Sequence, residues 1–198
     1  LIALALIFPP IASAIDLPPE KAYAGHKLMD DWNTEEAEHF TNSLLKKYPK
    51  SGDVYFLKAR VEFLKGNHEL AAKILKQVTG NHSEVHEFKN LVYETYEETK
   101  LFATSESKHF IYRYQKGSDE ILVHYATKVL EKSYKILGKI FNYYPKEKVL
   151  VEFYPNRESF SKVSPLTLDD IAISGTVALC KYNRIMIISP GSLVRGYN

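Results

Sequence analysis

Histidines followed by glutamate are the residues of this chain whose types come closest to a catalytic motif. His68 and His86 each precede a glutamate, but Ala72 and Asn90 stand where the zinc motif His-Glu-x-x-His requires its second histidine. His82 and His86 are four residues apart and can share one helical face, a geometry that binds a metal ion when further ligands are near. No third ligand is evident, so we expect no metal site in this chain.

The other reactive side chains also lack the partners that chemistry requires. Cys180 follows an apolar run in a predicted strand, and we interpret it as a buried structural thiol rather than a nucleophile. Ser-x-x-Lys begins at Ser43, Ser105 and Ser159, but the motifs that accompany it in serine hydrolases are missing. Asp169-Asp170 is more typical of a solvated loop than of a cation site. The residues therefore predict no catalytic group.

Composition excludes further classes of function. The chain has 198 residues and a formal charge of +2, from 26 basic and 24 acidic side chains. This balance does not favour nucleic acid as a partner, because such proteins concentrate positive charge. With one cysteine, no disulfide can form within the chain.

The first residues have the pattern of a secretory signal peptide. An apolar run, Leu1–Phe8, precedes Pro9-Pro10 and the small-x-small pattern Ala12-Ser13-Ala14. The run is too short to cross a membrane, and the alternative is a buried N-terminal helix. We expect a partial signal peptide at residues 1–14, cleavage near Ala14, and an exported protein of the periplasm or cell envelope without a membrane span.

Residues 15–103 have the pattern of helical hairpins. Apolar residues recur at helical spacing over 20–31, 34–47, 52–65, 68–79 and 82–99. Trp32-Asn33 and Gly66-Asn67 are 34 residues apart, and the small residues Gly25 and Ala59 share that offset. This period resembles tetratricopeptide repeats over roughly 20–83. The concave face then serves either as a binding surface or as a spacer or dimerisation module, and so few repeats should dock on the C-terminal half of the chain.

Residues 104–198 change to a strand and helix pattern. Phe110, Tyr112 and Tyr114 alternate in a predicted strand, 108–114, and place three aromatic rings on one face. The later predicted elements are an amphipathic helix over 119–141, a central strand over 148–154, a short helix from Asn156, a loop or helical turn over 166–171, and a hairpin with its turn at Lys181–Asn183. In that long helix we expect one apolar stripe, formed by Leu122, Tyr125, Val129, Ile136 and Ile140 and widened by Ala126, Leu130, Leu137 and Phe141. The predicted fold class is α + α/β, with tetratricopeptide-like hairpins before a small, incomplete α/β layer that ends in a β-hairpin.

Residues 174–190, with Leu193 and Gly196-Tyr197 after them, resemble the peptidase-MA-like domain of bacterial exported proteins. The resemblance covers roughly 104–198 and includes His109-Phe110, Tyr125-Ala126, Leu130-Glu131, Val149–Val151 and Tyr154–Phe160. In that family, tetratricopeptide repeats precede a zinc peptidase domain of the gluzincin type. Gly191 departs from the pattern, which has a larger and often basic residue there.

The resemblance implies a helix with the motif His-Glu-x-x-His after the hairpin. In that family, the two histidines of the motif and a later glutamate hold zinc, and the glutamate of the motif acts as general base. The chain stops before such a motif, so no catalytic or metal residue is carried over and we expect this chain to be inactive and free of zinc. The resemblance further implies that an edge strand pairs with the substrate backbone. The candidate substrate-binding residues are Gly175, Thr176, Val177, Ala178 and Leu179, with Arg184–Ile188 as the alternative.

The sequence supports two functional hypotheses. In the first, the chain is the N-terminal fragment of an exported zinc metallopeptidase, and its repeats bind or dock a peptide or protein. In the second, it is a non-catalytic repeat scaffold or binding protein of the cell envelope. Oligomeric state is left open by both.

Overall fold

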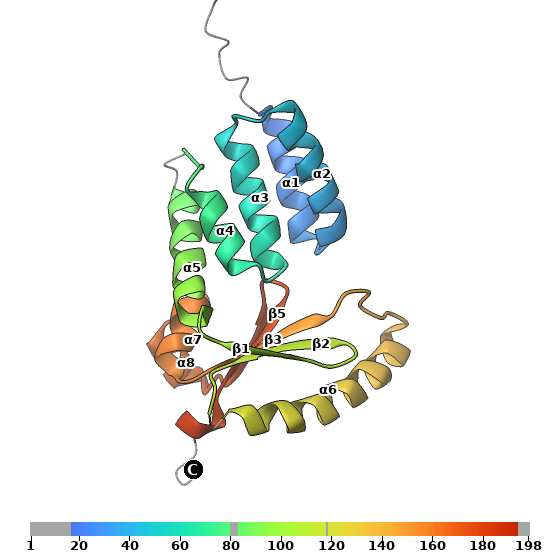
Figure 1. The fold of residues 1–198 in the computed structure, drawn as a ribbon, viewed down its shortest axis with the longest axis vertical. Helices are drawn as coiled ribbons and strands as arrows, with labels where there is room; N and C mark the ends of the chain where they lie inside the picture. Colours follow the sequence, from blue (N-terminus) through green and yellow to red (C-terminus); the bar gives the residue numbers. More distant parts are fainter. Residues whose placement is uncertain (1–16, 80–82, 118, 194–198) are drawn as a thin grey trace, which may run out of the picture.

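The computed structural model describes residues 17–79, 83–117 and 119–193 and consists of a helical part that stands on a mixed sheet (Figure 1). The helices of the first part are α1 (Pro19–Asp30), α2 (Thr34–Lys47), α3 (Gly52–Leu64), α4 (His68–Leu75) and α5 (Ser83–Thr99). The second part comprises β1 (Ala103–Glu106), β2 (Phe110–Tyr114), α6 (Glu120–Phe141), β3 (Val149–Tyr154), α7 (Arg157–Val163), α8 (Leu168–Ser174), β4 (Ala178–Lys181), β5 (Arg184–Ile188) and a 3-10 turn (Pro190–Ser192). This order confirms the predicted fold class. The predicted signal peptide, residues 1–14, lies outside the described residues.

Small residues allow the repeat helices to pack closely. Ala37, Ala59 and Ala71 are fully buried, and Gly25 is buried against α3. A Cβ atom at Gly25 would lie 2.8 Å from Leu57 Cδ1, so alanine there would force the fully buried Leu57 side chain to shift. The helical pairs therefore depend on these positions for their spacing.

The sheet has the strand order β1-β2-β3-β5-β4 and is parallel across its three central strands. β1 pairs antiparallel with β2, and β4 pairs antiparallel with β5. One face carries Phe110, Tyr112, Val151 and Phe153 and packs against α6. The opposite face carries Tyr154, Met186 and Ile188 under α7 and α8, beside the charged residues that contact the repeats. The predicted central position of the 148–154 strand is confirmed.

The terminal hairpin turns at two residues with left-handed backbone. Tyr182 and Asn183 have φ of 54° and 58°, which is the signature of a tight type I′ hairpin turn. Because β5 pairs with β3, the outer strand of the hairpin is β4. The segment Arg184–Ile188 is therefore an inner strand rather than an edge.

Several expectations about element bounds and burial were wrong. The strand predicted at 108 begins at Phe110, because residues 107–109 form the bend that joins it to β1, a strand the pattern missed. The helix predicted to reach 79 ends at Leu75. Of the two alternatives predicted for 166–171, loop or helical turn, the helical one is confirmed, because α8 begins at Leu168. Cys180 is exposed rather than buried, because the face of β4 that carries it has no helix over it among the described residues.

The predicted stripe of α6 is also wrong in most of its members. Tyr125, Val129, Ile136 and Ile140 are exposed, and of the predicted five Leu122 alone packs on the sheet. Of the residues that widen the stripe, Ala126 and Leu130 contact the sheet, whereas Leu137 and Phe141 are exposed. Val123 and Tyr134, which lie outside the predicted stripe, also contact the sheet. The helix is therefore rotated away from the orientation that its apolar stripe predicts.

Candidate functional site

A buried cluster of charged side chains joins the repeats to the sheet. Glu152, fully buried in β3, lies 3.1 Å from Arg184 Nε through Oε2 and 3.3 Å from Arg113 Nη1 through Oε1. The Tyr154 hydroxyl donates to Glu152 Oε2 at 2.6 Å. His68, the first residue of α4, reaches this cluster from the repeats. One carboxylate thus lies close to two guanidinium groups beneath the helical part.

The cluster spans residues far apart in sequence and fixes the repeats on the sheet. Arg184 Nη1 donates to His68 Nε2 at 2.8 Å, and Arg113 Nη1 donates to the Gly66 carbonyl at 2.7 Å. The Asn183 amide donates to the Leu64 carbonyl at 3.2 Å at the end of α3. These bonds confirm the expectation that the repeats dock on the C-terminal half of the chain.

The protonation states within this junction follow from burial. Burial, with smaller contributions from Arg184 and Arg113, lowers the pKa of His68 to about 3, so its ring is neutral at pH 7. Because Nε2 accepts from Arg184, Nδ1 carries the proton and donates to Thr99 Oγ1 at 3.2 Å. Burial is the largest single influence on Glu152 and raises its pKa, but Arg184, His68, the Tyr154 hydroxyl and Arg113 together outweigh it, so the pKa of this carboxyl is below its ordinary value. Burial raises the pKa of Tyr154, which keeps its hydroxyl protonated.

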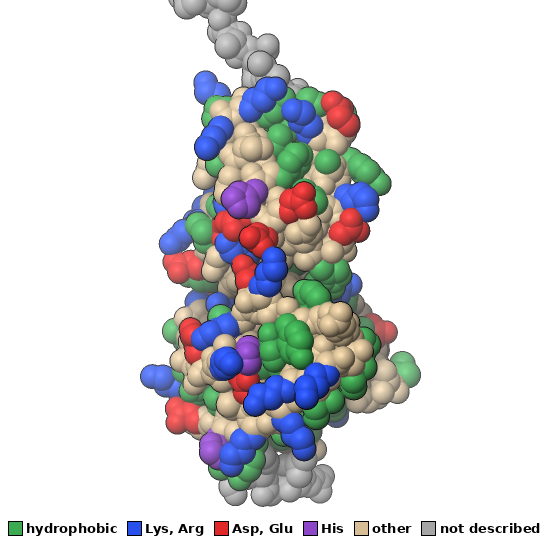
Figure 2. All heavy atoms as spheres, turned by 90° about the vertical axis from the view of Figure 1, so that its right-hand side faces the viewer, with side chains coloured by type: hydrophobic (Ala, Val, Ile, Leu, Met, Phe, Trp, Pro, Cys, Tyr) green, Lys and Arg blue, Asp and Glu red, His purple; other side chains and the backbone are tan. Residues whose placement is uncertain are grey.

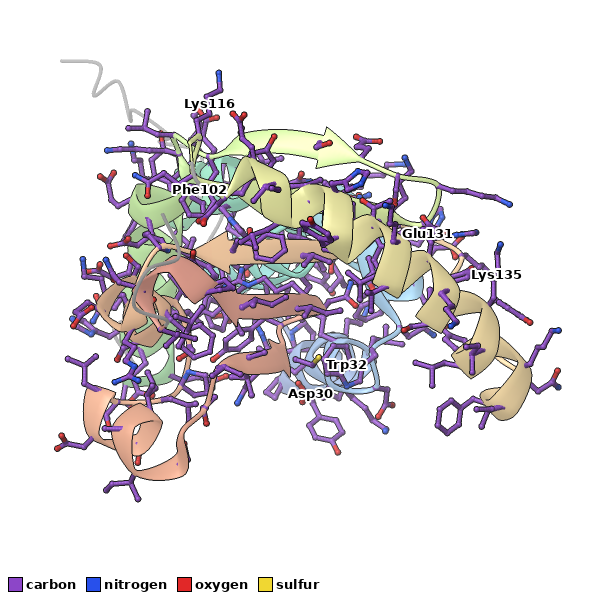
Figure 3. The ribbon with its side chains drawn as sticks, turned by 90° about the horizontal axis from the view of Figure 1, so that it is seen from below. Asp30, Trp32, Phe102, Lys116, Glu131 and Lys135 are labelled. Carbon is purple, nitrogen blue, oxygen red and sulfur yellow. The ribbon has the colours of Figure 1, made fainter. Side chains whose placement is uncertain are left out.

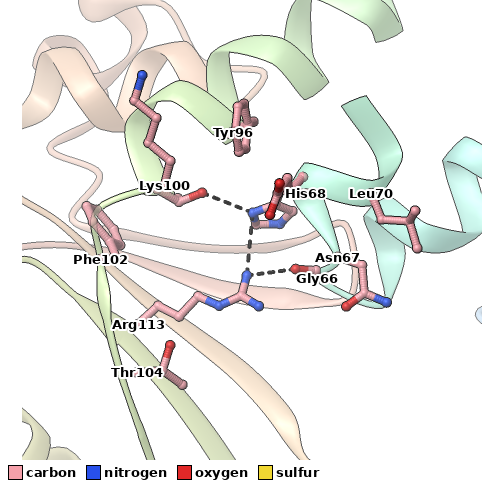
Figure 4. A pocket seen from close by; sticks show the side chains of 11 residues that line it. Gly66, Asn67, His68, Leu70, Tyr96, Lys100, Phe102, Thr104 and Arg113 are labelled. Atoms are coloured by element: carbon pink, nitrogen blue, oxygen red, sulfur yellow. Dashed lines mark hydrogen bonds between the residues drawn. The ribbon is translucent and has the colours of Figure 1, made fainter. Parts of the chain in front are cut away.

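A pocket of about 480 Å³ opens beside this cluster, and we call it the junction pocket (Figure 4). The residues that line it include Arg113, His68, Thr99, Lys100 and Phe102. The polar atoms of His68 and Arg113 facing it are bonded to protein groups, as the dashed lines in Figure 4 show. The junction pocket therefore belongs to a joint whose polar groups bind one another.

A second and larger hollow, about 800 Å³, lies between the first repeat and the sheet part. The molecule narrows at this level in the side view (Figure 2). We call this hollow the aromatic cleft, because Trp32, Tyr143 and Tyr144 line it and are 59%, 68% and 46% exposed. Its remaining lining residues are Asp31, Asn33, Thr34, Glu35, Asn142, Pro145, Lys146, Glu147, Lys148, Val149 and Asn183.

Backbone strain accompanies the aromatic cleft. The described residues include four non-glycine residues with positive φ, and three of them, Trp32, Asn142 and Asn183, line the cleft. Asparagine adopts this conformation at little cost, whereas for a bulky residue such as tryptophan it is an outlier. Strained positions of this kind persist where the surrounding structure holds them, and they concentrate at functional sites.

The repeat itself shows that glycine would fit the position of Trp32. After α1, the Trp32 amide donates to the Met29 carbonyl at 3.1 Å and the Asn33 amide to the Leu28 carbonyl at 2.9 Å. After α3, the amides of Gly66 and Asn67 make the equivalent two bonds at 3.0 and 2.8 Å. Both turns are Schellman motifs, in which glycine is the usual left-handed residue. The first repeat carries tryptophan where the second carries glycine.

Charge in the aromatic cleft is mixed. Asp31 and Glu35 come from the first repeat, whereas Lys146, Glu147 and Lys148 come from the loop before β3. Lys148 Nζ is already paired with Glu106 in β1 at 2.6 Å. This balance does not favour a polyanion, and it leaves the aromatic rings and Pro145 as the main contact surface.

The candidate substrate-binding residues, Gly175 to Leu179, fall at the edge of the sheet but do not form one strand. Gly175 is the left-handed C-cap of α8, with φ of 66°, and Ala178 and Leu179 begin β4. Val177 extends the pairing, because its carbonyl accepts from the Ile188 amide at 2.9 Å. Their role in binding a substrate stays a prediction.

The remaining sequence candidates have structural roles or lie apart. Asp170 accepts from the Thr167 hydroxyl at 2.7 Å and completes the capping box of α8. His86 bonds Asn90 across one helical turn, and His82 lies outside the described residues.

Across residues 17–79, 83–117 and 119–193, no three His, Cys, Asp or Glu side chains are grouped to hold a metal ion. In the same part of the chain, no helix is both long and apolar enough to span a membrane.

Sequence reasoning missed both the junction and the aromatic cleft, although each left a signal. Glu152 stands in an otherwise apolar central strand, where an isolated carboxylate requires buried partners. Trp32 aligns with Gly66 in the repeat period, and this mismatch in residue type marks the cleft.

Comparison with known proteins gives one family. The sequence profile of the family described as Iml2/Tetratricopeptide repeat protein 39 matches residues 10–143, which is more than half of the 198 residues. No curated protein and no solved structure matches the chain. The matched range contains all five helices of the repeats and continues through α6. The chain therefore belongs to the Iml2/Tetratricopeptide repeat protein 39 family.

Proposed function

We propose that this protein is a non-catalytic binding module that holds a peptide segment of a partner protein in the aromatic cleft. The observation that carries this proposal is Trp32, a large exposed ring held at a backbone position where the equivalent residue of the next repeat is glycine. Such a ring supplies much contact area at little cost in conformational freedom, which is why tryptophan is enriched at binding hot spots.

The surrounding structure supports this choice of surface. Repeat proteins of this kind use extended surfaces to bind partners. On the adjoining faces of α1 and α3, however, Arg60 contacts His26 and lies 3.2 Å from Asp30, so these side chains already bind one another. The aromatic cleft instead presents three exposed rings between elements that the buried junction holds in place.

The chemistry of the cleft indicates the kind of segment that it accepts. Aromatic and proline surface favours an apolar or aromatic side chain, and the mixed charges of Asp31, Glu35 and Lys146 favour a peptide backbone with few net charges. Nucleic acid does not fit this balance.

Peptide selection tests the proposal. Dodecapeptides from a random display library are selected on the wild-type protein and titrated against wild type and Trp32→Gly. Because Trp32 is the single tryptophan of the chain, its intrinsic fluorescence reports binding to the wild type, and the anisotropy of a fluorescein-labelled peptide measures affinity for both proteins. We expect selected peptides to change this fluorescence and to bind Trp32→Gly at least tenfold more weakly, as at a hot spot. Equal affinity for both proteins would exclude the aromatic cleft as the binding site.

We propose as a second candidate that the α/β layer is part of an exported zinc metallopeptidase, as the resemblance implies. The position of β4 at the sheet edge supports it, because an edge strand can pair with an extended peptide. The residues present do not fit a zinc site, since the chain has no His-Glu-x-x-His and its described residues hold no ligand cluster. Two measurements on the full-length gene product test this candidate: its zinc content, and its chelator-sensitive cleavage of an unfolded protein. A full-length protein without metal and without activity would exclude the candidate.

Export to the periplasm or envelope is tested by the N-terminal sequence of the mature protein.

A further inference from the structure

The exposed flank of α6 forms an apolar surface apart from the aromatic cleft. Tyr125, Val129, Ile136 and Ile140 are 59%, 63%, 46% and 66% exposed. At about 100° per residue, spacings of four and seven residues place these four side chains in one row along the helix. We call this row the α6 stripe.

Hydrogen bonds on the opposite flank hold the α6 stripe outside the core. Glu131 accepts from Ser107 Oγ at 2.7 Å, from the His109 amide at 2.9 Å and from His109 Nδ1 at 2.6 Å. The Tyr134 ring stacks on His109 with 3.8 Å between centroids, and its hydroxyl donates to the Pro145 carbonyl at 2.9 Å. These contacts fix the rotation of α6, so its stripe cannot turn towards the sheet.

Among the described residues, no helix covers half of the sheet face beside this stripe. Figure 3 shows α6 crossing the sheet and leaving β5 and β4 without a helix over them in that view. On this face Ile185 and Ile187 of β5 are half-buried, and Ala178 and Cys180, paired with them across β4, are exposed. Glu131 points to the β1–β2 side, so the α6 stripe lies on the side of β5 and β4. Stripe and sheet together form an apolar corner.

Positive charge borders this corner. Lys128, Lys132, Lys135 and Lys139 are exposed on α6 and project next to the α6 stripe, on the side away from the sheet. None of them is paired with a carboxylate of residues 17–79, 83–117 or 119–193. Figure 2 shows Lys and Arg side chains next to hydrophobic ones over the lower half of the molecule.

We propose that the corner formed by the α6 stripe and the β5–β4 face binds an amphipathic, acidic helix of a partner protein. The apolar row fits the apolar face of such a helix, and the lysine row selects carboxylates on its flank. The row from Tyr125 to Ile140 spans about 22 Å, which matches four turns of a bound helix. A second copy of α6 packed antiparallel would place like-charged lysine rows together, which disfavours self-association.

Designed peptides test this inference with the whole chain. One fluorescein-labelled peptide of sixteen residues carries a leucine face flanked by glutamates, and a second carries the same face flanked by lysines. Fluorescence anisotropy in about 0.15 M salt measures their binding. We expect saturable binding of the glutamate peptide and at least tenfold weaker binding of the lysine peptide.

Matched variants locate the site. Val129→Asp should weaken the glutamate peptide at least tenfold, and the double variant Lys132→Glu, Lys135→Glu should weaken it while strengthening the lysine peptide. Ile173→Asp is the control, because Ile173 is 87% exposed on α8 away from the corner. Trp32→Gly should bind the glutamate peptide as wild type does, which separates this inference from the proposed function. Circular dichroism checks that each variant is folded.

Three results would overturn the inference. The first is the absence of saturable binding, or equal binding of both peptides. The second is sedimentation of the wild type as a dimer that Val129→Asp dissociates, which assigns the corner to a second copy. The third is Val129-dependent binding to vesicles of anionic phospholipid without binding of the glutamate peptide, which assigns it to a membrane surface.

Discussion

Replacing Trp32 by glycine and by alanine separates the cost of its backbone conformation from the contribution of its ring. Both substitutions delete the ring, so any difference between them comes from the backbone at this position. Trp32 has φ of 60°. A residue with a Cβ atom pays about 1–2 kcal/mol in the left-handed region, whereas glycine adopts it freely.

The expected difference follows from two opposing effects. Glycine removes the strain of about 1–2 kcal/mol but adds roughly 0.5–1 kcal/mol of unfolded-state entropy relative to alanine. Trp32→Gly should therefore be more stable than Trp32→Ala by about 0.5–1 kcal/mol, which is roughly 1–4 °C in melting temperature for a chain of this size. At an ordinary helix or strand position the order would be reversed.

The equivalent position of the second repeat is the control. Gly66 has φ of 78°, and a Cβ atom there would lie 2.7 Å from Leu150 Cδ2. Gly66→Ala should therefore cost about 2 kcal/mol or more, from strain and steric overlap together. Urea unfolding followed by circular dichroism measures all three variants. If Trp32→Ala equals or exceeds Trp32→Gly in stability, the strain at this position is no larger than the entropy cost of glycine, about 0.5–1 kcal/mol, which contradicts the strain assigned to Trp32.

Three further predictions concern the junction and the sheet edge. The pKa of His68 is lowered from 6.5 to about 3 in the folded state, so on acidification the unfolded chain binds the proton first. The free energy of unfolding should therefore fall as the pH drops below 6.5, by up to roughly 1.4 kcal/mol per pH unit. His68→Gln should flatten urea-unfolding stability between pH 6.5 and 5, and an unchanged slope would show that His68 does not titrate in this way. Glu152→Gln leaves Arg184 buried without its counter-charge and should cost about 3–5 kcal/mol in the same assay, whereas a loss under about 1 kcal/mol would contradict the buried ion cluster. Cys180 should react with a maleimide in the native protein as an exposed thiol does, and a requirement for denaturant would show that the thiol is covered.

Local signals in the sequence predicted the elements that depend on local physics. The helices of the repeats start and end close to their predicted residues, because caps such as Asn33 and stops such as Pro49 act within a few residues. Asn156 likewise caps α7, where its side chain accepts from the Ser159 amide at 2.8 Å. The alternating aromatics of β2 placed its buried face correctly.

Contacts between distant residues decided what the sequence did not predict. The apolar stripe of α6 predicts burial, but Glu131 bonds Ser107 and His109 and turns the helix so that the stripe faces outward. Cys180 has apolar neighbours yet is exposed, because strand order and helix placement decide which face of β4 is covered. The cluster of Glu152, Arg184 and His68 joins residues up to 116 positions apart, so no local pattern could assemble it.

Hydrogen–deuterium exchange of the complex with a selected peptide gives the sharpest test of the proposed binding site, because it locates the peptide on the protein. We predict increased protection of residues 31–35 and 142–149 together, since these two segments form the walls of the aromatic cleft. Trp32→Gly should lose both effects at the same peptide concentration. Protection confined to β4, to α6 or to the exposed faces of α1 and α3, with these two segments unchanged, would show that the peptide binds elsewhere than in the cleft.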